Sequence, residues 1–162
     1  MKLIIGRHGE AESNSLTGLD KDRRLTEKGR ADIARMADFI LNTPLKVTQI
    51  FHSPYIRTNE TAEIYSEILQ FQGSLNPANS LLPSTDYTDL IPTLSKFSNS
   101  DTVLIIGHNP DVSFFAAKLI QDESLSRTFG FTPGTTVAIN IAKENFLRGQ
   151  LIWMISPEFL KS

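Results

Sequence analysis

Two short apolar segments of the sequence carry the same four letters, LIIG, and each leads to a histidine. The first spans residues 3–6 and precedes Arg7 and His8, and the second spans residues 104–107 and precedes His108. A short continuous apolar run is typical of a strand that is buried on both faces of a sheet. Ligands of open α/β sheets bind at the carboxyl ends of the strands. Both histidines are therefore predicted at one sheet edge, and in one pocket if the two strands are neighbours.

Strand-like and helical segments alternate along the chain. We expect strands over residues 2–6, 47–51, 102–107, 135–141 and 150–155, and helices from residue 26 to Pro44, from 53 to 69, over 90–97 and over 109–120. The last two strands are expected to be antiparallel, because the link between them is too short for a crossover helix. The pattern predicts an α/β fold, a three-layer sandwich with a mostly parallel central sheet, an antiparallel addition and helices on both faces.

Apolar spacing and proline positions define the expected helices. Ser53 and Asn109 each precede a proline and are predicted N-caps, because proline fits the first helical position. Residues 73–86 are rich in Ser, Asn and Pro and are predicted to form a long surface loop. The expected buried faces of the first two helices are Ile33, Met36, Ala37, Ile40 and Leu41, and Ala62, Ile64, Tyr65, Ile68 and Leu69.

Length and composition limit the class of protein. The chain has 162 residues, which suits a single domain over residues 1–162. No window approaches the roughly 18 apolar residues of a membrane span, and the N-terminal apolar run is too short for a signal peptide, so we expect a cytoplasmic protein without a membrane partner. The chain lacks cysteine, which excludes thiolate catalysis. The net charge of −2 argues against a nucleic-acid partner, and a monomer is the simplest expectation.

The strand predicted over residues 47–51 is followed by a helix that begins at the same sheet edge. Arg57 lies in the first turn of that helix. Arg7 and Arg57 are permanent cations whose planar forks match phosphoryl oxygens, and His108 can add a further donor. Nothing in the sequence resembles a carboxylate cluster for magnesium, so the pattern favours a phosphoryl group bound without metal or other cofactor. Nearby cations lower the pKa of a histidine and keep it neutral. A neutral imidazole nitrogen is a competent nucleophile toward phosphorus.

Four stretches of the sequence resemble the histidine phosphatase superfamily, the phosphoglycerate mutase-like group with an RHG signature. They are LIIGRHGEAESN, DRRLTEKGRADIARMADFI, IFHSPYIRTNETA and VLIIGHNPDVSFFA, and together they run along nearly the whole chain. The resemblance implies that His8 is the phosphorylated nucleophile. It gives Arg7, Arg57 and His108 the role of holding the phosphoryl group. It also implies a mixed sheet flanked by helices, and no metal.

Within this superfamily the chain most resembles the small SixA-type phosphohistidine phosphatases. It shares their short length, the sequence GHNP at the second histidine, and the ending LIWMISPEFLK. The stretch RHGEAESN instead places Glu10 and Asn14 as the mutase-like branch does, where the matching asparagine touches the phosphate. We therefore expect Asn14 to be a secondary substrate contact, and we interpret Glu10 as a solvated loop charge.

No strong proton donor is evident in the sequence. Hydrolysis of an alkyl phosphate needs a proton donor for the leaving alkoxide, yet Asn109 follows His108 where acid-phosphatase-like members have aspartate or glutamate. Asp86 is the candidate donor, with Asp89 nearby, and Asp86 is equally interpretable as a loop or cap aspartate. The leaving imidazole of a phosphohistidine can already carry a proton on its other nitrogen. A weak or absent acid therefore favours phosphohistidine as the substrate.

The sequence thus predicts a metal-independent phosphatase that acts through a phosphohistidine on His8 and dephosphorylates phosphohistidine protein. One alternative is a small-molecule phosphomonoesterase of the same superfamily, acting on a sugar phosphate or similar phosphorylated metabolite. Another is a non-catalytic module that binds phosphate or a phosphoprotein. A metal hydrolase is weaker still, because none of the three histidines lies at ligand spacing with a carboxylate. His52 is interpreted as structural.

Overall fold

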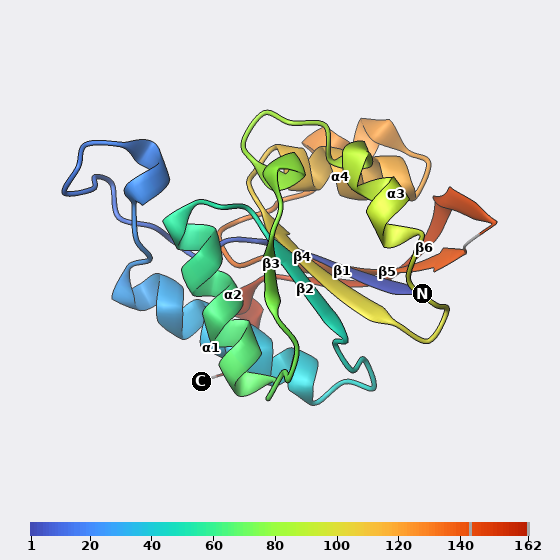
Figure 1. Ribbon diagram of the computed structural model, residues 1–162, viewed down its shortest axis with the longest axis horizontal. Coiled ribbons are helices and arrows are strands. Elements are labelled where there is room, and N and C mark those ends of the chain that lie inside the picture. Colours follow the sequence, from blue (N-terminus) through green and yellow to red (C-terminus); the bar gives the residue numbers. More distant parts are fainter. Residues whose placement is uncertain (143, 162) are drawn as a thin grey trace.

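A computed structural model describes residues 1–142 and 144–161 of the chain (Figure 1). Its centre is a six-stranded sheet with the strand order β3-β2-β4-β1-β5-β6. The strands are β1 (Lys2–Arg7), β2 (Gln49–His52), β3 (Leu75–Pro77), β4 (Thr102–Gly107), β5 (Thr136–Ala142) and β6 (Asn145–Ile155). The first four are parallel to one another, β5 is antiparallel to β1, and β6 is antiparallel to β5. The predicted mixed sheet with an antiparallel addition is confirmed.

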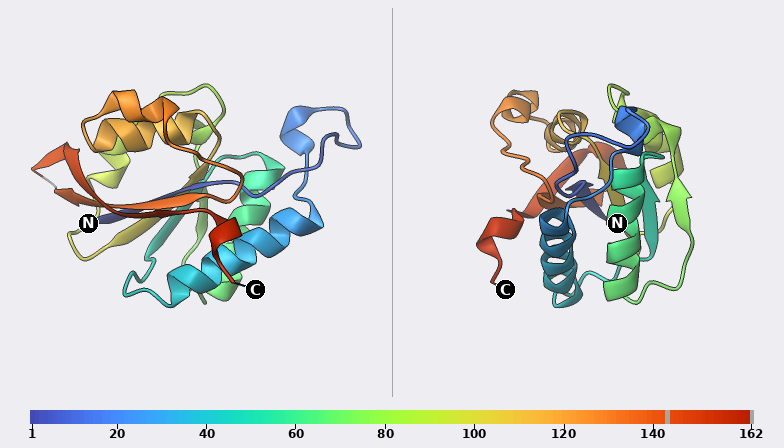
Figure 2. Two further views of the ribbon diagram at one scale, coloured as in Figure 1. Left: turned by 180° about the vertical axis from the view of Figure 1, so that it is seen from behind. Right: turned by 90° about the vertical axis from the view of Figure 1, so that its left-hand side faces the viewer.

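Helices cover both faces of the sheet, as the views in Figures 1 and 2 show. The helices are α1 (Glu27–Leu41), α2 (Ile56–Ile68), α3 (Ile91–Leu94) and α4 (Asp111–Leu119), and the described residues also contain five short 3₁₀ turns. The predicted three-layer sandwich is therefore confirmed. Among the described residues, no helix has the length and apolar character needed to cross a membrane.

Alternating side chains of the central strands supply two apolar cores. Leu3 and Ile5 pack into a cluster with α3 and α4, whereas Ile4 packs into a second cluster with α1 and α2. This alternation is the period of two of a strand with both faces covered. The predicted buried face of α1 is confirmed for Ile33, Met36, Ala37 and Ile40. Leu41 is the exception, with 49% of its surface exposed at the helix end.

The two predicted proline caps are wrong. Helix α2 begins at Ile56 with Tyr55 as its N-cap, and α4 begins at Asp111 with Pro110 as its N-cap. The hydroxyl of Ser53 lies 2.9 Å from Nε2 of His108, and Oδ1 of Asn109 accepts from Ser113. Both polar side chains are thus used in other contacts, and the helices start later than the sequence suggests.

Two strand assignments also differ from expectation. The predicted loop over residues 73–86 contains β3, because Leu75 packs against the cluster beneath α1 and α2 and the backbone extends the sheet beside β2. β6 begins at Asn145, earlier than the predicted start at 150, because it pairs with β5 along most of its length. Neither difference changes the edge at which β1 and β4 end.

The segment after β1 is fastened to the start of α1. The side chain of Thr26 caps α1 by accepting from the backbone N–H of Gly29 at 2.9 Å. The backbone N–H of Thr26 donates to the carbonyl of Glu10, and that of Glu12 donates to the carbonyl of Arg24. A side chain at Gly29 would overlap the backbone of Glu10. Helix α1 therefore fixes the path of the chain directly beyond His8.

Replacing Gly29 with alanine is expected to destabilise the fold by about 1–3 kcal/mol, because the added methyl would displace Glu10. For a chain of this size, each kcal/mol lowers Tm by roughly 2–4 °C, which thermal unfolding monitored by circular dichroism can measure. Gly130→Ala is the matched control, since no atom of the described residues, apart from its two chain neighbours, lies within 4 Å of a methyl built there. Equal Tm values for the two variants would contradict this packing.

Candidate active site

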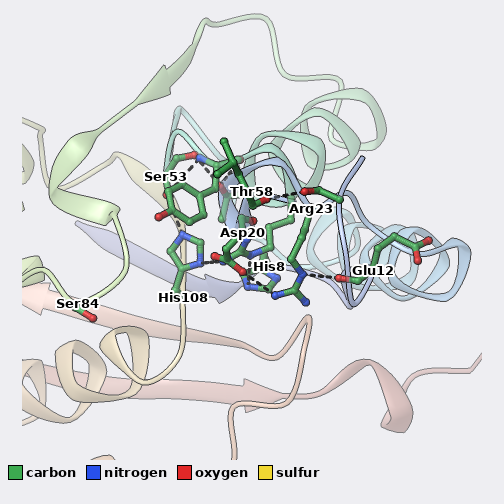
Figure 3. A network of polar contacts seen from close by, with 12 residues as sticks. His8, Glu12, Asp20, Arg23, Ser53, Thr58, Ser84 and His108 are labelled. Carbon is green, nitrogen blue, oxygen red and sulfur yellow. Dashed lines mark hydrogen bonds and ion pairs between the residues drawn. The ribbon is translucent and has the colours of Figure 1, made fainter. Parts of the chain in front are cut away.

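The histidines predicted at the sheet edge lie beside each other. β1 and β4 are paired in parallel with Arg7 opposite Gly107, so His8 and His108 follow at equivalent positions. Both side chains are buried, and their ring centroids are 5.2 Å apart with the planes at 64°. Figure 3 shows the two rings close to Asp20. The sheet topology thus brings together two residues that are a hundred positions apart in the chain.

The hydrogen bonds of His8 define its tautomer. Nδ1 lies 2.7 Å from the carbonyl oxygen of Gly9, which can only accept, so Nδ1 carries the proton. Nε2 accepts from the Nε–H of Arg57 at 3.1 Å. His8 is therefore a neutral imidazole whose Nε2 lone pair points toward a guanidinium.

His108 has the opposite arrangement. Its Nδ1 lies 3.4 Å from Nη2 of Arg57, which can only donate, so Nδ1 presents a lone pair. Its Nε2 then donates to the hydroxyl of Ser53 at 2.9 Å. The backbone N–H of His108 donates to the hydroxyl oxygen of Tyr87 at 2.9 Å, and that hydroxyl donates onward to the carbonyl of Leu81. These contacts hold the ring on both sides.

Arg57 links the two histidines from the first turn of α2. Its side chain is only 6% exposed. Besides its contacts to His8 and His108, it donates from Nη1 to the carbonyl oxygen of Asp20 at 2.7 Å, and from Nη2 to the Asp20 carboxylate at 3.0 Å. Its guanidinium carbon also lies 4.9 Å from the centre of the Tyr55 ring. Arg57 is thus the centre of a polar network that joins His8, His108 and Asp20.

Arg7 leaves one buried donor unused. Its Nη1 donates to the carbonyl of Phe131 at 2.6 Å. Its Nε is buried and, within the described part of the chain, has no hydrogen-bond partner. Burial, and then the charge of Arg57, lower the pKa of Arg7 from its ordinary value. A buried donor without a partner is costly, and the oxygen of a bound anion would satisfy it.

Burial makes both histidines weak bases. It lowers the pKa of His8 from 6.5 to about 4, with further lowering by the charges of Arg57, Arg7 and Arg23, while the Gly9 carbonyl acts in the opposite direction. Burial likewise lowers the pKa of His108 to about 3, assisted by His8 and Arg57. Both rings are therefore neutral at physiological pH.

Asn14 lies in an exposed loop, whereas His52 is the last residue of β2. Asn14 is exposed and, with Asp20 and Arg23, lines a small cavity of about 160 Å³. No hydrogen bond between described residues joins Asn14 to either site histidine. His52, interpreted as structural, is buried, and its Nδ1 donates to the carbonyl of Ser53 at 2.8 Å.

Asp86 caps a 3₁₀ turn, as the loop or cap interpretation of this residue anticipates. Its carboxylate accepts from the backbone N–H of Thr88 at 2.9 Å, a bond that holds the pKa of Asp86 below its ordinary value. An exposed, ionised carboxylate is a poor proton donor. Asp86 also lines a cavity of about 460 Å³ together with Tyr87 and Asp111. Burial raises the pKa of Asp111, so Asp111 is the better acid in this cavity.

Sequence reasoning missed Asp20 and Tyr55, and it gave Ser53 the wrong role. Asp20 stands in a polar loop beside Asp22, and no spacing rule distinguishes the two. Tyr55 gives no separate sequence signal, yet its ring lies 5.1 Å from that of His108. These side chains join the site only through tertiary contacts.

The arrangement can bind a tetrahedral oxyanion next to a nucleophile. Three arginines, Arg57, Arg7 and Arg23, act electrostatically on His8, whose unprotonated Nε2 accepts a hydrogen bond from Arg57. Cations at a phosphoryl group stabilise the charge that spreads over its oxygens during transfer. Within residues 1–142 and 144–161, no three histidine, aspartate or glutamate side chains are grouped so as to hold a metal ion.

Comparison with known proteins shows relatives that are similar to this chain in sequence and fold. The model of the histidine phosphatase superfamily (branch 1) matches residues 3–77. Phosphohistidine phosphatase SixA of Escherichia coli (strain K12) is 26% identical over 163 residues, which cover 99% of this chain and 97% of that protein. The structure of the protein histidine phosphatase SixA complexed with tungstate has a TM-score of 0.87 and 25% identity, covering 99% of this chain and 100% of the other. A phosphoserine phosphatase from Entamoeba histolytica, in complex with 3-phosphoglyceric acid, shares the fold with a TM-score of 0.68 and 14% identity, covering 96% of each chain.

The burial of neutral histidines predicts a loss of stability in mild acid. The unfolded chain protonates His8 and His108 below a pH of about 6.5, whereas the folded protein keeps them neutral down to about 4 and about 3. Stability is therefore full above the unfolded pKa and falls as pH drops through this window. We expect the free energy of unfolding to fall between pH 7 and pH 5 by on the order of 2 kcal/mol for each histidine.

Urea unfolding at pH 7 and pH 5 measures this loss. The variant His8→Asn removes one of the two titrating rings and should lose less stability than the wild type over the same interval. An unchanged loss in that variant would contradict the burial of a neutral His8.

Proposed function

The chain belongs to the histidine phosphatase superfamily and is a phosphatase, and we propose that it works without a metal ion through a phosphohistidine intermediate on His8. The observation that carries the proposal is the tautomer of His8. Its proton lies on Nδ1 against the Gly9 carbonyl, and its Nε2 lone pair lies among cations. An unprotonated imidazole nitrogen that needs no deprotonation is ready to attack phosphorus.

In the first step, Nε2 of His8 attacks phosphorus in line with the leaving group. A bond forms between phosphorus and Nε2, while the bond to the leaving group breaks and its electron pair leaves with that group. The Nδ1–H of His8 stays on the Gly9 carbonyl, so the ring keeps its orientation. The Nε–H of Arg57, which donates to Nε2 in the free protein, is released to a phosphoryl oxygen.

Arg7, Arg57 and His108 hold the phosphoryl group in this proposal. The unused Nε–H of Arg7 supplies one donor. His108 becomes a donor at Nδ1 in its other tautomer, in which Nε2 has lost its proton, Nδ1 has gained one and the Ser53 hydroxyl donates to Nε2 across their 2.9 Å contact. The tungstate in the similar SixA structure supports a site for a tetrahedral oxyanion. Asn14 is proposed only as an outer contact, since it lies on the exposed loop.

In the second step, water attacks phosphorus and releases phosphate. A bond forms between the water oxygen and phosphorus, the bond to Nε2 breaks, and its electron pair returns to Nε2. The proton of water leaves to a phosphate oxygen or to solvent. His8 is thereby restored with its proton on Nδ1, in the tautomer seen in the free protein.

We propose phosphohistidine in a protein as the substrate. Asn109 follows His108 and has no acidic proton to give, and Asp86 is held ionised. A leaving imidazole that carries a proton on its other nitrogen departs as a neutral molecule and needs no such donor. The similar protein from Escherichia coli is a phosphohistidine phosphatase, which supports the same chemistry here.

One observation favours the alternative of a small-molecule phosphomonoesterase. Asp111 lines a cavity with Tyr87, whose hydroxyl contacts the backbone of His108, and burial raises the pKa of Asp111. A carboxyl group that is easier to protonate could serve an alkoxide leaving group. The two functions therefore differ in whether the reaction needs Asp111.

Replacement of His8 with asparagine is expected to abolish the covalent phosphoenzyme and to lower turnover by at least about 10³-fold, because the nucleophile is lost. Brief incubation with ³²P-labelled substrate, followed by acid-free quenching, detects the intermediate. His52→Asn is the matched control, because His52 is also a buried histidine at a strand end. A non-catalytic phosphate-binding module would give no label even in the wild type.

A phosphohistidine peptide is expected to be turned over with kcat/KM about 10²-fold or more above that of a phosphoserine peptide of the same sequence, because general acid catalysis is missing. Steady-state phosphate release from both peptides measures the ratio. Faster turnover of the phosphoserine peptide, together with loss of that activity in Asp111→Asn, would instead contradict phosphohistidine as the substrate and favour phosphomonoester chemistry that uses Asp111.

A further inference from the structure

Asp20 forms two hydrogen bonds with Arg57, although the two residues lie far apart in the chain. It begins the 3₁₀ turn Asp20–Asp22 in the loop between β1 and α1, whereas Arg57 lies in α2. Its backbone carbonyl accepts from Nη1 at 2.7 Å, and its carboxylate accepts from Nη2 at 3.0 Å. One residue therefore supplies two acceptors to the same guanidinium, in a bidentate contact that also fixes orientation.

The two edges of the Arg57 guanidinium have different partners. A guanidinium directs Nε–H and one Nη2–H along one edge, and Nη1–H and the other Nη2–H along the next edge. The first edge meets Nε2 of His8 and Nδ1 of His108. The second edge meets Asp20. Because the guanidinium is planar and rigid, the hydrogen bonds of Asp20 to the second edge set the direction in which the first edge donates.

Asp20 is itself held in place. Arg23 donates from Nη1 to the second carboxylate oxygen of Asp20 at 2.8 Å, and from Nε to the carbonyl of Glu12 at 2.5 Å. The Asp20 side chain is 56% exposed, while that of Arg57 is 6% exposed. Figure 3 shows Asp20 close to Arg23 and to the two histidines. The contact thus connects an exposed loop to the buried arginine of the site.

We propose that Asp20 is a positioning residue for the reaction, which orients Arg57 so that its Nε–H and Nη2–H edge meets the phosphoryl group on His8. The proposal rests on the proposed function, because it assigns the phosphoryl group to Arg57. Asp20 touches neither substrate nor reacting atoms in this role. The oxygens of a trigonal transition state need well-directed donors, so the effect of Asp20 falls on kcat more than on KM.

The test compares Asp20→Ala with Asp22→Ala in the intact chain. Asp22 shares the 3₁₀ turn, and its carboxylate accepts from the Thr17 hydroxyl at 2.6 Å, so its removal disturbs the same loop. With phosphoimidazole as the phosphoryl donor, we expect Asp20→Ala to lower the single-turnover rate of phosphoenzyme formation by about 10- to 100-fold. Asp22→Ala should stay within about twofold of the wild type. Asp20→Asn keeps an acceptor for Nη2 and should recover part of the rate.

The same variants in an Arg57→Ala background show whether Asp20 acts through Arg57. Without Arg57, Asp20→Ala should cause no further loss, because the two residues then belong to one non-additive unit. An equal additional loss in that background, or equal rates for Asp20→Ala and Asp22→Ala, would overturn the proposal. A wild type that forms no phosphohistidine on His8 would instead reject the proposed function. Circular dichroism and Tm confirm that each variant is folded.

Discussion

The parallel pairing of β1 with β4 is the constraint on which the site depends. Both strands are central and apolar on both faces, so a register slip of one residue would move every side chain to the wrong face. The observed register sets Arg7 opposite Gly107, and the two histidines follow. Position 107 also requires a glycine for a local reason. A side chain there would overlap the Tyr87 hydroxyl that accepts from the backbone N–H of His108. The strand register in the core thus sets the positions of both histidines.

Arg57 then joins the strand ends to the helical layer. Its hydrogen bonds to both histidines require each ring to present a lone pair, which only a neutral ring can do. The lowered pKa values of the two histidines are consistent with neutral rings, and burial is the largest cause of the lowering. Geometry and electrostatics therefore select the same protonation state. The remaining proton of His8 is placed on the Gly9 carbonyl, which leaves Nε2 as the reactive atom.

The sequence predicts the central strands well, because a run that is buried on both faces leaves a continuous apolar signal. The boundaries of β4 agree with the predicted residues 102–107, while β3 has three residues including a proline and leaves no comparable signal. The helix starts after β2 and β4 were wrong because Ser53 and Asn109 use their side chains elsewhere. Cap chemistry is local, and its competitors in the folded protein are not visible in the sequence.

The candidate site was likewise predictable where its residues follow the predicted strands, and not where they join it through tertiary contacts. His8, Arg57 and His108 stand next to predicted strand ends or in a first helical turn, so topology alone brings them together. Asp20 and Tyr55 reach Arg57 through a loop path and a ring contact that no periodicity encodes. A loop aspartate can pair with any nearby cation, and the choice is made by tertiary packing.

The burial that keeps His8 neutral also bears on the second half of the proposed reaction. A phosphohistidine that keeps its Nδ1 proton carries a positive ring, and the same burial and cationic surroundings that lower the pKa of His8 disfavour that ring. The phosphoryl group offsets part of this cost while it stays bound. Attack by water removes the positive ring and restores the neutral imidazole on the Gly9 carbonyl. A site that makes His8 a weak base therefore also makes it a good leaving group, so the environment that selects the nucleophile favours its release.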